Sequence, residues 1–66
     1  MENRNLLEAR LKEKELTPEQ LSKKIGLSYT SLNQRLNGRT DFKLGEIKKI
    51  RQVLELSIDQ MVEIFF

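Results

Sequence analysis

The sequence predicts an all-α fold, a compact bundle of about five short helices. Three observations predict it. Apolar residues recur at spacings of three and four in successive short segments, which is the period of a helix face. Capping residues precede these segments, and glycine follows two of them. No segment alternates apolar and polar residues as a half-buried strand does.

The first helix is expected to run from Asn5 to about Lys14. Asn5 can cap it because Glu8 follows three residues later and can bond back to the cap. Leu7 and Leu11 lie four residues apart, so they share one face of this helix. That face is expected to be buried.

The second helix has the stronger start signal. Thr17 is a good cap, Pro18 occupies the first helical position where a missing N–H does no harm, and Gln20 can bond back to the cap. Leu21 and Ile25 again lie four residues apart. We expect them to form the buried face of a helix that begins at Pro18.

Gly26 is expected to end the second helix, because glycine adopts the left-handed conformation of a sharp turn. Ser28 can cap a third helix, which buries Leu32 and Leu36 and ends at the Asn37–Gly38 pair. Two short helices joined by a turn that contains glycine form a helix-turn-helix. We place it at residues 17–37.

Two more helices are expected after a loop over residues 39–43, in which Phe42 turns inward. The apolar face of the fourth helix comprises Leu44, Ile47, Ile50 and Leu54. Ser57 and Gln60 form a cap pair for the last helix. The apolar residues of that helix are Ile58, Met61, Val62 and Phe65.

Composition narrows the class of function. The chain has no Cys, which excludes disulfides and thiolate metal sites, and no His, the commonest general base and metal ligand. Asp59 and Glu63 lie four residues apart on the last helix, but without a third ligand or a His they are expected to be a solvated face. We therefore expect neither an enzyme nor a bound metal or cofactor.

Hydropathy and length predict a single cytoplasmic domain over residues 1–66. No apolar run approaches the roughly 20 residues that span a bilayer, and the N-terminus is too charged for a signal peptide. Membrane contact is not expected. A chain that starts at Met1 and ends on apolar residues favours a whole protein over a piece of a longer regulator.

Charge is distributed unevenly along the chain. Residues 23–51 carry eight Lys and Arg against two acidic residues, a net charge of +6, whereas the segments before and after carry −1 and −3. A basic centre with acidic flanks points to a polyanionic partner met by one face. The alternative is an ordinary solvated surface, which we expect for Lys48, Lys49 and Arg51.

The outward face of the helix at residues 28–37 is expected to consist of uncharged hydrogen-bonding residues: Tyr29, Thr30, Asn33, Gln34 and Asn37. Such side chains can read base edges in the major groove of DNA. Phosphates are bound by cations, hydroxyls and the first N–H groups of helices. Candidates for that role surround this helix: Lys24, Ser28, Arg39 and Lys43.

The chain resembles the Cro/Xre-type helix-turn-helix regulators, especially small phage and prophage Cro-like and repressor domains, over about residues 5–62. The resemblance rests on the run TPEQLSKKIGLSYTSLNQRLNGRT and on FKLGEIKKIRQVLELSIDQM after it. It implies a lambda repressor-like DNA-binding fold. It also implies a transcriptional regulator, a Cro-like repressor that binds a duplex DNA operator through the major groove with helix 28–37.

The resemblance also implies which residues contact DNA. Base contacts fall on Tyr29, Thr30 and Gln34, with Asn33 either a further contact or only a solvated neighbour. Phosphate contacts fall near Thr17 and Pro18, at Ser28, and around Asn37, Gly38 and Arg39. There are two alternatives. Tyr29 would cover the turn with its ring, and Arg39 and Lys43 would be plain surface charges.

Three positions depart from the family pattern. Pro18 lacks the side-chain donor that a glutamine would give, so a contact there must come from Glu19 or Gln20. Ser22 stands where Ala is usual, which is tolerated if its hydroxyl bonds back to a helix carbonyl. Arg35 stands where an apolar residue is common, which leaves the packing of the third helix on the fourth open.

The apolar C-terminus has two interpretations. Ile64, Phe65 and Phe66 either complete the core or form the seam of a homodimer on DNA, whose recognition helices would lie about 34 Å apart. No small-molecule effector is expected. The rival to a DNA-binding function is a protein-interaction module that uses the same helical scaffold to bind another regulator.

Overall fold

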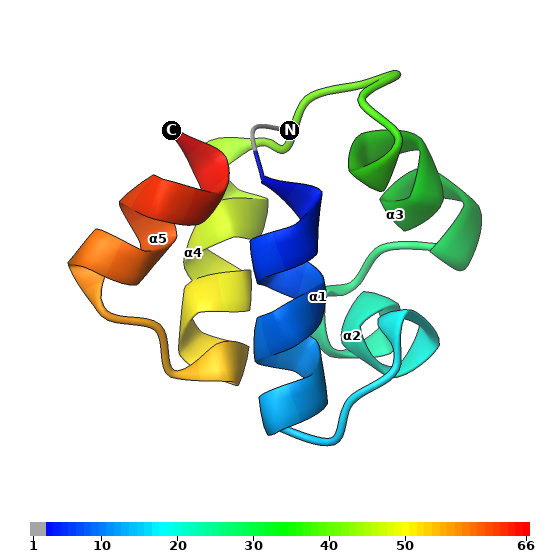
Figure 1. The fold of residues 1–66 in the computed structure, drawn as a ribbon. Coiled ribbons are helices and arrows are strands. Elements are labelled where there is room, and N and C mark those ends of the chain that lie inside the picture. Colours follow the sequence, from blue (N-terminus) through cyan, green and yellow to red (C-terminus); the bar gives the residue numbers. More distant parts are fainter. Residues whose placement is uncertain (1–2) are drawn as a thin grey trace.

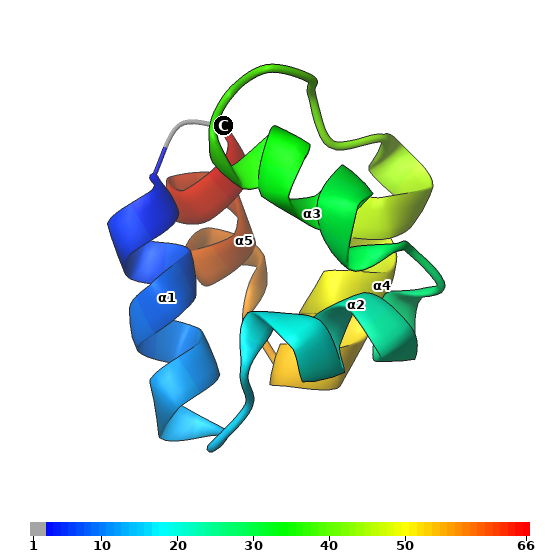
Figure 2. The same ribbon diagram turned by 90° about the vertical axis from the view of Figure 1, so that its right-hand side faces the viewer.

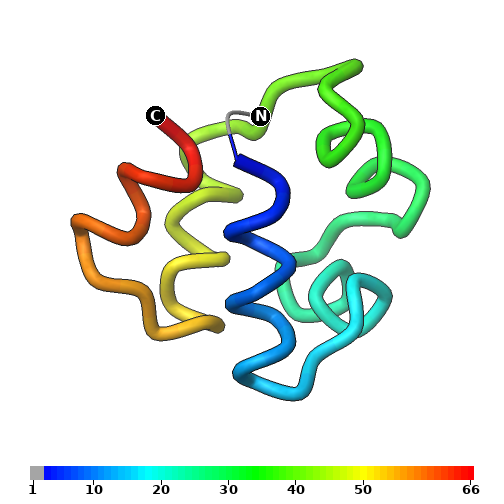
Figure 3. The backbone as a smooth tube through the Cα atoms, in the orientation of Figure 1, coloured from blue at the N-terminus to red at the C-terminus, as the bar shows by residue number. Residues whose placement is uncertain are grey.

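The computed structural model describes residues 3–66, and this range is all-helical, as the sequence predicts. Its five helices are α1 (Arg4–Glu13), α2 (Pro18–Ile25), α3 (Tyr29–Leu36), α4 (Leu44–Leu54) and α5 (Ile58–Phe65). Figure 1 shows α1 between two pairs of helices, with α4 and α5 on one side and α2 and α3 on the other. The tube in Figure 3 shows how short the connections are.

The start of α1 differs from the prediction. Asn3, not Asn5, caps the helix, because its side-chain oxygen accepts the N–H of Leu6 at 3.1 Å. The backbone N–H of Asn3 also donates to the carbonyl of Ile64 at 3.1 Å, which ties the cap to α5. Asn5 lies inside the first turn. The predicted cap at Asn5 is therefore wrong by two residues.

The start and end of α2 are confirmed. Thr17 and Gln20 bond reciprocally, with the Gln20 N–H donating to the Thr17 hydroxyl at 3.2 Å and the Thr17 N–H donating to the Gln20 side chain at 2.9 Å. Gly26 ends the helix with a φ of 75°. Glycine adopts this left-handed conformation readily because a glycine residue has no Cβ.

The ends of α3 are also confirmed. The Ser28 hydroxyl accepts the N–H of Ser31 at 3.1 Å. Asn37 is the last residue before Gly38, whose φ of 76° turns the chain away. The N–H of Arg39 then donates to the carbonyl of Gln34 at 2.9 Å, so the loop begins folded back on the helix.

One core holds the helices together. Its buried apolar residues come from each of the five helices and from the last connection: Leu7, Leu11, Leu21, Ile25, Leu32, Leu36, Ile47, Ile50, Leu54, Leu56, Ile64 and Phe65. Leu44 does not join them, because its side chain is 60% exposed at the start of α4. The predicted α4 face is otherwise correct.

The buried face of α5 was only partly predicted. Ile58 and Val62 are 59% and 45% exposed, whereas Ile64 and Phe65 are buried against the core and Met61 is half-buried. Phe66 is 68% exposed. The C-terminal tripeptide is therefore divided, since Ile64 and Phe65 complete the core and Phe66 faces solvent.

Phe42 anchors the loop between α3 and α4. As predicted, it turns inward and packs against the core. Its ring meets that of Phe65 edge-on, with centroids 5.3 Å apart and an interplanar angle of 75°. Edge-to-face geometry of this kind is favourable for aromatic pairs. The loop is thus fixed at one point to the last helix.

An ion pair joins α3 to α4. The guanidinium of Arg35 donates to both carboxylate oxygens of Glu46, at 2.8 and 3.1 Å, and to the carbonyl of Ser31 at 3.1 Å. Glu46 also accepts the N–H of Lys43 at 3.0 Å. The two charged side chains are only 12% and 13% exposed. This pair answers the open question of how Arg35 packs.

Stability is expected to fall in acid because of this pair. Burial raises the pKa of Glu46, but the N–H of Lys43 and the guanidinium of Arg35 outweigh it and hold the pKa below its ordinary 4.5. A carboxyl group whose pKa is lowered by folding stabilises the folded state at pH values above the pKa that it has in the unfolded chain. That contribution is lost as the pH falls through the pKa of the folded state. The free energy of unfolding should therefore decline below about pH 4.5.

Urea denaturation followed by circular dichroism, from neutral pH down to about pH 3, measures this decline. The control is Glu55→Gln. The pKa of Glu55 is also lowered, by its hydrogen bond from Lys14, but Glu55 is exposed and contributes little. In Glu55→Gln, the free energy of unfolding should fall with pH nearly as much as in the unaltered protein. A free energy of unfolding that does not change with pH in the unaltered protein would contradict the role given to Glu46.

Candidate nucleic-acid interface

The packing of α2 against α3 fixes how α3 stands on the molecule. Leu21, Ile25 and Leu32 are buried where the two helices meet, and Leu27 in the turn packs against them. Ser22 is buried too, and its hydroxyl donates to the carbonyl of Glu19 at 2.6 Å. The hydroxyl therefore replaces the usual Ala without an unsatisfied group. The predicted bond of the Ser22 hydroxyl to a helix carbonyl is confirmed, as is the predicted burial of the apolar residues of α2 and α3.

The outer face of α3 is open to solvent. Tyr29 is 44% exposed, Thr30 and Gln34 are exposed, and Asn33 is half-buried. Figure 2 shows α3 across the upper part of the view with α2 below it. The four candidate base-reading residues thus lie on one short helix, and Asn33 is the least accessible of them.

Three candidate phosphate-binding side chains are already engaged as caps. The oxygens of Thr17, Gln20 and Ser28 accept backbone N–H groups at the starts of α2 and α3. In α3 this leaves the N–H groups of Tyr29 and Thr30 at the start of the helix, where the helix dipole favours an anion. In α2 only the N–H of Glu19 is left, because Pro18 has none and the Gln20 N–H is bound by Thr17. The caps of α2 use oxygens as acceptors, so the Thr17 hydroxyl and the Gln20 amide NH2 keep donors for a phosphate.

The three candidate cations precede and follow α3 along the chain. Lys24 lies in the last turn of α2, and Arg39 and Lys43 lie in the loop after α3; all three are exposed. Within residues 3–66, none of the three forms a salt bridge. Their charges are available to an anionic partner, unlike that of Arg35, which Glu46 neutralises.

Two contacts near this face had no signal in the sequence analysis. Arg4, at the start of α1, donates to the side-chain oxygen of Asn37 at 2.6 Å and thereby reaches the end of α3. Arg35 was counted among the basic residues but is bound by Glu46. Charge counts along a sequence could not have found either, because both contacts join different helices.

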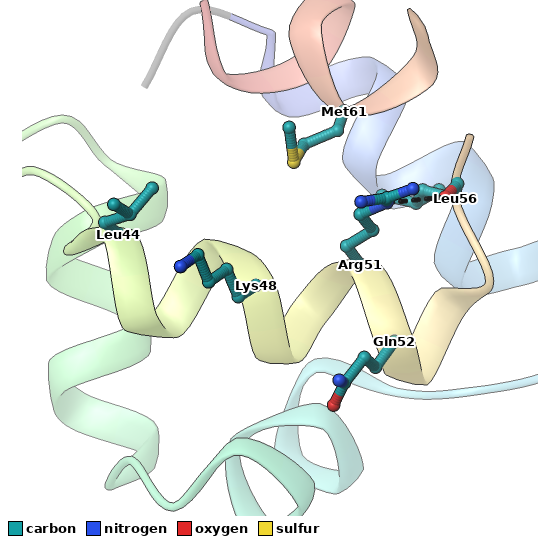
Figure 4. A pocket seen from close by; sticks show the side chains of 6 residues that line it. All are labelled: Leu44, Lys48, Arg51, Gln52, Leu56 and Met61. Carbon is teal, nitrogen blue, oxygen red and sulfur yellow. Dashed lines mark hydrogen bonds between the residues drawn. The ribbon is translucent and has the colours of Figure 1, made fainter. Parts of the chain in front are cut away.

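A hollow lies between α4 and α5. Figure 4 shows its lining residues, Leu44, Lys48, Arg51, Gln52, Leu56 and Met61. Arg51 donates there to the carbonyl of Leu56 at 3.2 Å. One wall is apolar and the other carries two cations, so the hollow lacks the polar row seen on α3.

No three acidic side chains of residues 3–66 come together as a metal site would require, and Asp59 and Glu63 are exposed. Over the same range, none of the helices combines the length and apolar character of a membrane span.

Comparison with protein families places the chain. A family model described as Helix-turn-helix matches residues 6–61, which is most of the chain and includes α2, the turn and α3. Comparison with curated proteins and with solved structures gave no match. Family and geometry agree, because the matched segment contains the two packed helices and the exposed α3 face. The chain belongs to the Cro/Xre-type helix-turn-helix family of DNA-binding regulators.

Proposed function

We propose that the protein binds a specific duplex DNA site by reading base edges in the major groove with α3, and that it acts as a Cro-like repressor by occupying that site. One observation carries the proposal: the exposed face of α3 holds uncharged hydrogen-bonding side chains, and three exposed cations flank α3 along the chain. The two kinds of residue match the two kinds of contact that DNA offers.

The dimensions of a helix support base reading. An α-helix with its side chains is about 10–12 Å across, and the major groove is about 12 Å wide, so α3 can lie in it. Gln34 can pair with adenine in bidentate fashion, and Thr30 and Tyr29 offer hydroxyls and apolar contact to a thymine methyl. Asn33 is a weaker candidate because it is half-buried.

Phosphate contacts would hold α3 in the groove. Lys24, Arg39 and Lys43 supply the charge. The N–H groups that follow Ser28 at the start of α3, and the side-chain donors of Thr17 and Gln20 at the start of α2, supply uncharged donors. Asn37 and Gly38 lie at the other end of α3, beside Arg39. Contacts at both ends of a helix fix its register without reading sequence.

A second copy is proposed to pair through α5. The exposed residues Ile58, Val62 and Phe66 recur at every fourth position and form one row, here the α5 row. An exposed apolar row marks an interaction surface. Two copies joined symmetrically through this row would present two α3 helices to half-sites about one DNA turn apart.

Selection from a random DNA pool tests the proposal. The unaltered protein should recover a motif with two-fold symmetry, and the Tyr29→Ala/Gln34→Ala variant should lose it while staying folded. A bidentate base contact is worth about 1–3 kcal/mol, so losing Gln34 should by itself weaken specific binding about 5- to 150-fold. Band-shift titration of the selected duplex measures that factor.

The matched control is Gln52→Ala, which makes the same change on the exposed surface of α4. It should bind the selected duplex as tightly as the unaltered protein. Recovery of no motif by the unaltered protein would refute sequence-specific reading. A single half-site bound one-to-one would refute only the dimer.

The α5 row also favours a second candidate, a module that binds another protein. Salt separates the two. For a DNA-binding protein, the logarithm of the binding constant falls with the logarithm of the salt concentration, with a slope of about −0.9 per phosphate contacted. Contact through an apolar row should respond little to salt.

A further inference from the structure

Arg4 links the first helix to the end of α3. It is the first residue of α1, yet its guanidinium donates from one terminal nitrogen to the side-chain oxygen of Asn37 at 2.6 Å. Its Nε–H donates to Glu8 one turn along α1 at 2.9 Å. The side chain is 47% exposed, so this link lies at the surface.

These contacts leave several donors directed outward. A guanidinium has five N–H groups, and Arg4 uses two of them on partners within residues 3–66. Because arginine can only donate, the oxygen of the Asn37 amide must face it, which leaves the amide NH2 pointing elsewhere. The pair therefore presents N–H donors from two side chains at one place.

The pair lies at the C-terminal end of α3, where a positive charge helps a phosphate to bind. The C-terminus of a helix carries a partial negative charge, which repels a phosphate. Asn37 follows the last residue of α3, and Arg39 comes two residues later. A guanidinium held beside Asn37 offsets the helix charge where DNA that lies along α3 would bring its backbone.

We propose that Arg4 and Asn37 together bind one backbone phosphate of the duplex, so that α1 contributes to the DNA-binding surface. This inference rests on the proposed function and adds to it a contact from a segment whose net charge is negative. Glu8 orients the guanidinium through Nε and leaves the outer edge of the fork for the phosphate.

The test compares Arg4→Gln with the matched control Lys49→Gln. Each removes one positive charge, Lys49 is an exposed residue of α4, and glutamine can still donate to Asn37. Affinity for the selected duplex is measured at several salt concentrations. Arg4→Gln should make the slope of log binding constant against log salt concentration less steep by about 0.9. Lys49→Gln should leave this slope unchanged. The affinity loss should be similar on specific and unrelated duplexes, because phosphates carry no sequence information.

The outcomes distinguish the two proposals. A flat salt dependence for the unaltered protein would overturn both. A steep dependence that Arg4→Gln does not change would overturn only the Arg4 contact and leave a surface link between α1 and α3. If Arg4→Gln fails to fold, the Nε–H resonance of Arg4 in the unaltered protein gives the answer by NMR. It should shift when the duplex is added, and an unmoved resonance would refute the contact.

Discussion

Replacing Glu46 with alanine is expected to destabilise the protein by about 3–5 kcal/mol. The change leaves the guanidinium of Arg35 largely buried without its partner, at a site where the charged groups are only 12% and 13% exposed. It also removes the acceptor of the Lys43 N–H. A domain of this size has only roughly 3–5 kcal/mol to lose, so the variant should be mostly unfolded at 25 °C.

Circular dichroism of the purified variant at 25 °C measures this effect as the fraction folded, and urea denaturation of the unaltered protein gives the reference free energy of unfolding. Glu55→Ala is the matched control because it breaks the exposed ion pair with Lys14, and it should cost about 1 kcal/mol or less. The double variant Arg35→Met/Glu46→Leu removes both charges and should recover most of the stability. Equal losses for Glu46→Ala and Glu55→Ala would show that the buried pair has no special role.

Replacing Leu32 with alanine is expected to cost about 2–5 kcal/mol. Leu32 is fully buried between α2 and α3, so the change removes apolar contacts and leaves a cavity in the helix-turn-helix itself. The expected consequence is a loss of stability together with a loss of DNA affinity, since α3 depends on this contact for its position.

Leu44→Ala provides the comparison, because it makes the same change at a leucine that is 60% exposed on α4. It should alter the free energy of unfolding by about 0.5 kcal/mol or less. Thermal melting followed by circular dichroism ranks the two variants. A Leu32→Ala variant as stable as Leu44→Ala would contradict the packing of α2 on α3.

The sequence predicted α2, the turn and α3 closely because their signals are local. Thr17 and Gln20 bond to each other, and Gly26 adopts the left-handed conformation that its lack of a Cβ permits. Each signal lies within a few residues of the feature it determines. Such features can be read without knowing the fold.

Features set by distant contacts could not be read in this way. Asn3 and Asn5 are the same residue type, so both are equally good caps by sequence. In the structure Asn3 is the cap, and its N–H also donates to the carbonyl of the distant residue Ile64. The helix α5 has apolar residues on several sides, so periodicity could not choose the face that packs on α1 and α4. Glu15 and Glu55 adopt left-handed φ values of 55° and 53°, for which the sequence carries no glycine signal.

The candidate site follows the same division. The exposed residues of α3 were placed on one face by helical spacing, and the structure puts Tyr29, Thr30 and Gln34 in solvent. The partners of Arg4 and Arg35 were not foreseen, because ion pairs between helices depend on how the helices pack.

The edge-on packing of Phe42 against Phe65 has a kinetic consequence for DNA association. The loop with Arg39 and Lys43 is held at Phe42 before any partner arrives, so ordering it is part of folding and not of binding. A preorganised surface can dock nearly as a rigid body, without a slow rearrangement after encounter. For the proposed phosphate contacts of Arg39 and Lys43, the ring of Phe65 in the last helix thereby helps to set how quickly a duplex is captured.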